Sequence, residues 1–160
     1  MCDVSTLINR DVSPGNIVAC NGEGFLLDYH VACKEADCEQ PDAHITGKAW
    51  YRALSLNTGR HTVSTDLESL FYSVIDMASD GKALRWRHAC SEQQLYEKKF
   101  TSMMDGSTWE GKVLSRITFE MQAHVQRLHD LFFKPIASTG MYEYCGSSVT
   151  PSAFIEACLG

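Results

Sequence analysis

The sequence lacks several features that mark large classes of proteins. An apolar run of about 18 residues suggests a membrane span. The sequence has no run of this length, because its best candidate, residues 67–78, is interrupted by Glu68 and Asp76. It has no long block of Lys and Arg, and its formal net charge is −6. Nucleic acids and anionic lipids select basic surfaces, so we expect neither nucleic acid nor a membrane as a main partner. The first residues do not resemble a signal peptide, so we expect an intracellular protein, cytoplasmic or nuclear.

The seven cysteines are scattered and include no Cys-x-x-Cys pair. With an odd number and no recognisable secretory signal, reduced thiols are the expectation. Cys33, Cys38 and His44 have poor spacing for a zinc site and no fourth ligand, so we do not expect bound zinc.

What the sequence does contain is a polar motif close to its start. Arg10 and Asp11 are followed by a Pro-Gly turn signal and then by Asn16. Asp28 comes after two short apolar runs, 17–20 and 24–27, which a turn at Asn21-Gly22 joins into a predicted hairpin. This hairpin places Asp28 near Asn16. Asp and Asn beside Pro-Gly are common turn formers, but two oxygen ligands at one point are also what Mg²⁺ prefers.

The rest of the chain predicts a mostly helical domain. A helix is expected over residues 61–79, with a capping box from Thr65 to Glu68. Its apolar positions follow helical spacing, which predicts a central, buried helix. Further helices are expected over 91–104, from Trp109 to Pro135, and from Pro151 to the end, with a loop over 137–151. The apolar positions of the first helix are Leu67, Leu70, Phe71, Val74, Ile75 and Ala78.

These motifs together resemble a protein kinase. Residues 9–16 have the spacing of the kinase catalytic loop H-R-D-x-x-x-x-N, and residues 28–30 stand where D-F-G follows it. The stretches 10–17 and 65–72 look most like the fungal-type protein kinase family. The resemblance implies a mainly α (α+β) kinase C-lobe, with the catalytic loop and a short β-hairpin packed on a helical bundle. Residues 1–160 then form one partial kinase domain, and residues 30–60 form its activation segment.

The resemblance also implies roles for individual residues. Asp11 corresponds to the base that accepts the proton of the substrate hydroxyl, and Arg10 supports the activation segment. Asn16 and Asp28 correspond to the ligands of Mg²⁺ on ATP. Asp66, in the first turn of the 61–79 helix, corresponds to the carboxylate that accepts hydrogen bonds from the catalytic loop. An Asp near a helix N-terminus is also favoured by the helix dipole alone, but only the kinase resemblance predicts contact with Asn9 and Arg10.

Several positions depart from the kinase pattern. Asn9 occupies the position of the His in the catalytic loop, and His30 occupies that of the Gly in D-F-G. Ser55 occupies the position of the Glu that closes the activation segment. Ser13 occupies the place where Ser/Thr kinases usually have a Lys near the γ-phosphate, although Ser is usual there in fungal-type kinases. The Gly-rich loop, the strand Lys and the αC Glu of the N-lobe are not recognisable in the sequence.

Three functions are therefore open from the sequence. The first is ATP-dependent phosphorylation of protein Ser/Thr hydroxyls, of which this chain represents only the C-lobe, inactive by itself and in need of an N-lobe. The second is a non-catalytic pseudokinase module that binds a protein partner. The third is a small-molecule phosphotransferase of the aminoglycoside or choline kinase type, which also uses an Asp–x4–Asn loop.

Overall fold

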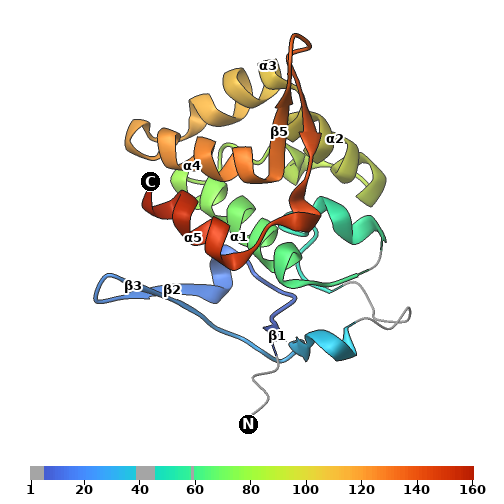
Figure 1. The fold of residues 1–160 in the computed structure, drawn as a ribbon, viewed down its shortest axis with the longest axis vertical. Helices are drawn as coiled ribbons and strands as arrows, with labels where there is room; N and C mark the ends of the chain where they lie inside the picture. Colours follow the sequence, from blue (N-terminus) through green and yellow to red (C-terminus); the bar gives the residue numbers. More distant parts are fainter. Residues whose placement is uncertain (1–5, 39–45, 59) are drawn as a thin grey trace.

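Helices and short antiparallel sheets are combined in this protein. The computed structural model describes residues 6–38, 46–58 and 60–160. Within these ranges the helices pack against one another, and the N-terminal strands lie along one side of the helical part (Figure 1). The expected α+β class is confirmed at this level. In the same ranges, no helix is both long enough and apolar enough to cross a membrane.

Helix α1, Val63–Ala78, is the central element of the core. It begins after Thr62, whose side chain accepts a hydrogen bond from the Thr65 amide, while the Thr65 side chain accepts one from the Thr62 amide. The capping box expected from Thr65 to Glu68 is therefore wrong, because Glu68 points into the core. The prediction that α1 is central is confirmed, since every expected apolar position belongs to the core or packs against it: Leu67, Leu70, Phe71, Val74, Ile75 and Ala78.

Aromatic side chains fill the space between α1 and the helices that follow. Phe71 lies between Trp109 and Phe132, with ring centroids 6.3 and 5.4 Å away, and Tyr72 meets the edge of Trp86 at 5.6 Å. All five side chains are fully buried. Burying large aromatic rings is among the strongest single contributions to a small core. The C-terminal helices therefore fix the position of α1.

The N-terminal strands bring the predicted site residues to α1. Strand β1, Leu7–Ile8, pairs with β4, Cys33–Lys34. Strands β2, Ile17–Cys20, and β3, Glu23–Leu26, form the expected hairpin, with Asn21 and Gly22 at positive φ in the turn. The Leu27 amide donates to the Asn16 carbonyl at 2.7 Å, so the chain returns to the start of the hairpin just before Asp28.

The C-terminal half differs from the expectation in two places. Helix α2, Glu92–Met104, begins at its expected cap, Ser91. The long helix expected from Trp109 to Pro135 is broken: short helical turns, including α3, Gly106–Thr108, precede α4, Phe119–Phe132. At the break Ile117 is extended, and the Thr118 amide donates to the carbonyl of Ala78 at the end of α1 instead of continuing the helix. A tertiary hydrogen bond thus overrides the local periodicity.

A second hairpin replaces the loop expected over 137–151. Strands β5, Phe133–Ile136, and β6, Met141–Tyr144, pair antiparallel, and Pro135 lies in β5. The fully buried Phe133 starts this hairpin next to Tyr144, with ring centroids 5.5 Å apart. The terminal helix α5, Pro151–Leu159, is present as predicted and packs through Phe154 against Phe132.

Two buried charges hold the end of the 46–58 segment. The Glu68 carboxylate accepts hydrogen bonds from the Leu54 amide at 2.8 Å, from the Tyr72 hydroxyl at 2.5 Å and from the Tyr144 hydroxyl. The Lys99 ammonium donates to the carbonyl of Arg52 at 2.7 Å and to that of Ala49 at 3.2 Å. Burial raises the pKa of Glu68 and lowers that of Lys99 to about 7. The segment is thus held although Ser55 replaces the Glu of the kinase pattern.

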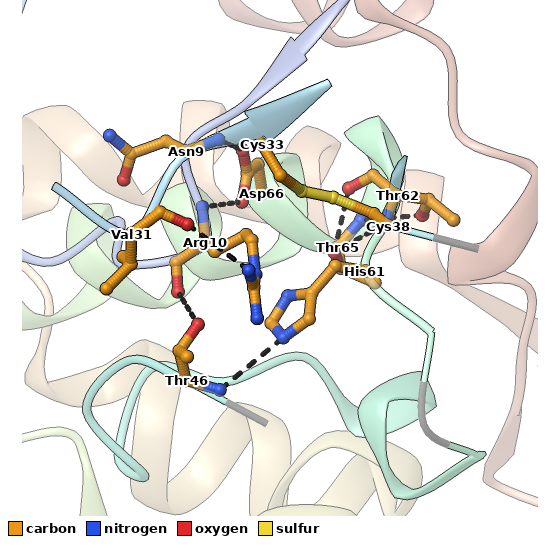
Figure 2. The surroundings of a disulfide bond; sticks show 10 residues. All are labelled: Asn9, Arg10, Val31, Cys33, Cys38, Thr46, His61, Thr62, Thr65 and Asp66. Carbon is orange, nitrogen blue, oxygen red and sulfur yellow. Dashed lines mark hydrogen bonds between the residues drawn. A yellow bond between two sulfur atoms is a disulfide. The ribbon is translucent and has the colours of Figure 1, made fainter. Parts of the chain in front are cut away.

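The cysteines correct another expectation. Cys33 and Cys38 form a disulfide, with Cα atoms 6.2 Å apart (Figure 2). The short helical turn Glu35–Asp37 reverses the chain between them, and the Cys38 amide donates to the carbonyls of Lys34 and Glu35. No Cys-x-x-Cys spacing marks this pair in the sequence. Cys20, Cys90, Cys145 and Cys158 are free thiols, whereas Cys2 and His44 lie outside the described residues.

We predict that Glu68→Ala lowers the free energy of unfolding by about 3–5 kcal/mol, because it leaves buried donors and the Lys99 charge without their partner. Glu97→Ala, on the exposed side of α2, is the matched control and should change this free energy by less than about 0.5 kcal/mol. Urea unfolding followed by circular dichroism measures both. Equal small effects of the two variants would show that Glu68 does not anchor the core.

Candidate functional site

Asp66, in the first turn of α1, binds the backbone of the 9–16 loop. One carboxylate oxygen accepts the Asn9 amide at 2.6 Å and the other accepts the Arg10 amide at 3.0 Å. Figure 2 shows both amides facing Asp66. Burial raises the pKa of Asp66, while the two amide bonds act in the opposite direction. The contact of Asp66 with Asn9 and Arg10 is therefore present. The kinase resemblance predicts this contact, whereas the helix dipole alone does not.

Arg10 takes an unusual backbone conformation at this point, with φ at 71°. Residues other than glycine seldom occupy this region, and such conformations persist where the surroundings hold them. Here the Arg10 amide is held by Asp66 and its carbonyl accepts from the Thr46 hydroxyl at 3.3 Å. Its guanidinium donates to the Val31 carbonyl at 3.3 Å. Arg10 thus contacts the start and the middle of the 30–60 segment, the region that it is expected to support.

Asn9 connects the two predicted acidic site residues. It is 3% exposed; its side-chain carbonyl accepts the Asp11 amide at 3.0 Å, and its side-chain amide donates to the Asp28 carbonyl at 3.1 Å. In the kinase pattern a His occupies this position. In the structure Asn9 itself fixes the loop to the chain at Asp28.

Asn16 and Asp11 are brought together by the short helical turn Pro14–Asn16. The Asn16 side-chain amide donates to the Asp11 carbonyl at 2.9 Å and to the Asp11 carboxylate at 3.2 Å. The Asn16 side-chain oxygen accepts no hydrogen bond from any described residue, so it remains available as a ligand. The other Asp11 carboxylate oxygen accepts the Lys48 amide at 3.2 Å.

Asp28 follows the hairpin with φ at 60°, and its carboxylate is about half exposed. It accepts hydrogen bonds from the imidazole and from the amide of His30. These side-chain and backbone hydrogen bonds lower the pKa of Asp28, so the carboxylate stays ionised at neutral pH. His30, at the place of the family Gly, therefore holds the Asp28 side chain.

The 46–48 turn closes over the 9–16 loop from the opposite side. Gly47 has φ at 83°, and a Cβ there would lie 2.6 Å from the Arg10 carbonyl oxygen, so the close approach requires glycine. The next residue, Lys48, extends its ammonium to the Ser13 hydroxyl at 3.3 Å. The Lys48 ammonium therefore lies beside Ser13, the residue at the place where Ser/Thr kinases usually have a Lys. Lys48 was missed by the sequence analysis because its contact with Ser13 depends on this long-range approach.

His61 closes the underside of this turn. It is 2% exposed, and its imidazole accepts the Thr46 amide at 3.5 Å. Burial, together with the nearby Arg10 and Arg52 charges, lowers the pKa of His61 to about 4. A neutral imidazole can serve as this acceptor, so His61 supports the loop and is not a group that changes charge near neutral pH.

The donor atoms near Asn16 and Asp28 are compatible with Mg²⁺. An amide oxygen and an ionised carboxylate are hard oxygen ligands, and Mg²⁺ is usually held by only one or two side chains plus the phosphates of its nucleotide. Across residues 6–38, 46–58 and 60–160, no group of three or more His, Cys, Asp and Glu side chains is placed to hold a metal by itself. The cavity that Asp11 lines under the loop measures only about 10 Å³, much less than a nucleotide needs.

The structure brings most of the predicted site side chains together, but Asp28 is placed differently from the others. Asp11, Asn16, Arg10 and Asp66 lie in one hydrogen-bonded network, and Asp28 joins it through its own backbone carbonyl. The carboxylate of Asp28 contacts His30. Their assigned roles in catalysis and metal binding stay predictions.

We predict that Asp66→Ala lowers the free energy of unfolding by about 1–3 kcal/mol, because the Asn9 and Arg10 amides lose their acceptor. Asp80→Ala removes a carboxylate that is 91% exposed and should have much less effect through lost contacts. Chemical denaturation measures both. If Asp66→Ala were no more destabilising than Asp80→Ala, the loop would not depend on this carboxylate.

Comparison with known families agrees with the motifs. No curated protein matches the sequence. The model of the fungal protein kinase family matches residues 3–77, which include the 9–16 loop, the β2–β3 hairpin and nearly all of α1. The resemblance to the fungal-type protein kinase family is therefore confirmed over residues 3–77 of this chain.

Proposed function

We propose that this chain is the C-lobe of a protein kinase, whose reaction is transfer of the γ-phosphoryl group of ATP to a Ser or Thr hydroxyl of a protein. The observation that supports this proposal most strongly is the pair of hydrogen bonds from the Asn9 and Arg10 amides to Asp66. They fix the loop that carries Asp11 to the central helix. A simple turn formed by Asp, Pro, Gly and Asn would not need this anchor.

In the proposed reaction Asp11 accepts the proton of the attacking hydroxyl. Its carboxylate is oriented by the Asn16 side chain and by the Lys48 amide. Asn16 and Asp28 would hold Mg²⁺, which neutralises charge on the ATP phosphates. The Lys48 ammonium donates to the Ser13 hydroxyl and would stabilise negative charge on the transferred group.

The nucleotide-binding half of such a site would have to come from another lobe. The cavity beside Asp11 cannot hold adenine, whereas the β2–β3 hairpin exposes apolar side chains. Val18 and Phe25 are cross-strand partners on one face of this hairpin and are 41% and 46% exposed. Exposed apolar surface of this kind is typical of an interaction site. We infer that an N-lobe would pack here, and that the isolated chain does not transfer phosphate.

A non-catalytic pseudokinase module is the second candidate. The observation that favours it is the contact between Asp28 and His30, because it occupies the carboxylate that would bind Mg²⁺. In that case the chain would bind a protein partner without using a nucleotide.

Addition of millimolar Mg²⁺–ATP tests whether this half of the site binds the metal and phosphates of a nucleotide, which the pseudokinase module would not do. If Asn16 and Asp28 bind the metal, the nucleotide should raise the melting temperature of the chain, because a ligand that binds only the folded state stabilises it. Asp28→Asn should abolish the rise. Asp80→Asn is the matched control, since Asp80 also has positive φ and is exposed. No rise in the unmodified chain would contradict binding of Mg²⁺–ATP by Asn16 and Asp28.

The role of Lys48 can be tested in the same assay. Lys48→Met should reduce the rise in melting temperature caused by Mg²⁺–ATP, because it removes a positive charge beside the phosphates. It should change the nucleotide-free melting temperature little, since the ammonium makes a single hydrogen bond, at 3.3 Å, to Ser13. Lys48→Arg should restore most of the rise, and Lys34→Met, at another exposed lysine, should not reduce it. A full response in Lys48→Met would exclude this role.

A further inference from the structure

Two adjoining cavities lie on the surface formed by α2 and the turns after α1, outside the candidate site. The first measures about 320 Å³ and includes Lys98 and Lys112 in its wall. The second measures about 430 Å³ and includes Lys82, His88 and Arg116. Arg85 lines both, so the two cavities adjoin at this residue, and together we call them the basic groove.

The basic groove concentrates positive charge in an acidic protein. Of the 14 Lys and Arg residues of the chain, five line the groove, although the net charge is −6. Glu97 is the single acidic residue among the described residues that line it, and the exposed Asp80 pairs with Lys82 at 3.2 Å. The groove is therefore a local region of charge opposite to that of the whole molecule.

Most of these cations have no internal role. Arg85, Lys98, Lys112 and Arg116 make no side-chain hydrogen bond or ion pair within the described ranges. By contrast, the buried Lys99 beside Lys98 is bonded to two carbonyls, and Arg87, near Arg85, pairs with Asp76. Like charges held around two hollows repel one another unless an anion is bound. The arrangement is thus suited to a ligand with several negative charges.

The composition of the groove selects among anionic ligands. No Phe, Tyr or Trp lines either cavity, so nucleic acid bases would find no aromatic ring on which to stack. The net charge of −6 also opposes a long polyanion that extends beyond the groove. A short chain with closely spaced carboxylates fits both the size and the charge. Thr101 also lines the first cavity and offers a hydroxyl group to such carboxylates.

We propose that the basic groove binds a short acidic segment of a protein partner. Its positive side chains meet the carboxylates of that segment, and Arg85, common to both cavities, contacts the middle of it. The proposal does not depend on phosphotransfer by the candidate site, because the groove shares no residue with that site.

Fluorescence anisotropy with a labelled oligoglutamate peptide tests this proposal on the whole chain. The peptide should bind, and oligoglutamine of the same length should not. Added salt should weaken binding, since exposed charges are screened. The triple variant Arg85→Glu, Lys112→Glu and Arg116→Glu should bind at least about tenfold more weakly, given that exposed charge pairs each contribute a modest amount.

The matched control reverses three exposed charges elsewhere: Lys34→Glu, Arg60→Glu and Lys134→Glu. It changes the net charge by the same amount and should retain at least about a third of the affinity. Circular dichroism melting of both triple variants verifies that they are folded. Equal weakening by the two triple variants, absence of oligoglutamate binding, or tighter binding of a single-stranded oligonucleotide of the same charge would each overturn the assignment.

Discussion

The hydrogen bonds between the Asp66 carboxylate and the amides of Asn9 and Arg10 are the contact on which the candidate site depends. They fix two successive peptide groups of a loop that has little regular structure of its own. The positive φ of Arg10 is held between this contact and the Thr46 hydroxyl. Once these residues are fixed, the Asn9 side chain reaches both Asp11 and the backbone at Asp28. A single carboxylate on a helix thus orders residues from three segments.

Helix α1 supplies further anchors along its length. Glu68 accepts the Leu54 amide, and Asp76 accepts the Tyr51 hydroxyl at 2.7 Å and pairs with Arg87. The loop with Asp11 and the segment that ends near Leu54 are therefore both attached to the same helix. Aromatic packing fixes that helix in turn, because Phe71 and Tyr72 lie among fully buried rings. The geometry of the site is in this way linked to the stability of the core.

The sequence predicted those parts of the structure that rest on local signals. The β2–β3 hairpin follows from Asn21-Gly22, helix α2 from Ser91, and helix α5 from Pro151. The contact of Asp66 with the loop was predicted from the family motif, not from periodicity. Features set by distant residues were missed, since no local pattern encodes them: the break at Thr118, which bonds to Ala78, and the approach of Lys48 to Ser13. The Cys33–Cys38 disulfide likewise depends on the turn between its two residues.

Residue-resolved amide hydrogen exchange tests the central claim most directly. If Asp66 fixes the 9–16 loop to α1, the amides of Asn9 and Arg10 should exchange at least about a hundredfold more slowly than the amide of Gly22, in the exposed hairpin turn. Their protection should approach that of the buried α1 residues Phe71 and Tyr72. Exchange of Asn9 and Arg10 as fast as that of Gly22 would contradict the account, because the loop would then open independently of the helix that is inferred to hold it.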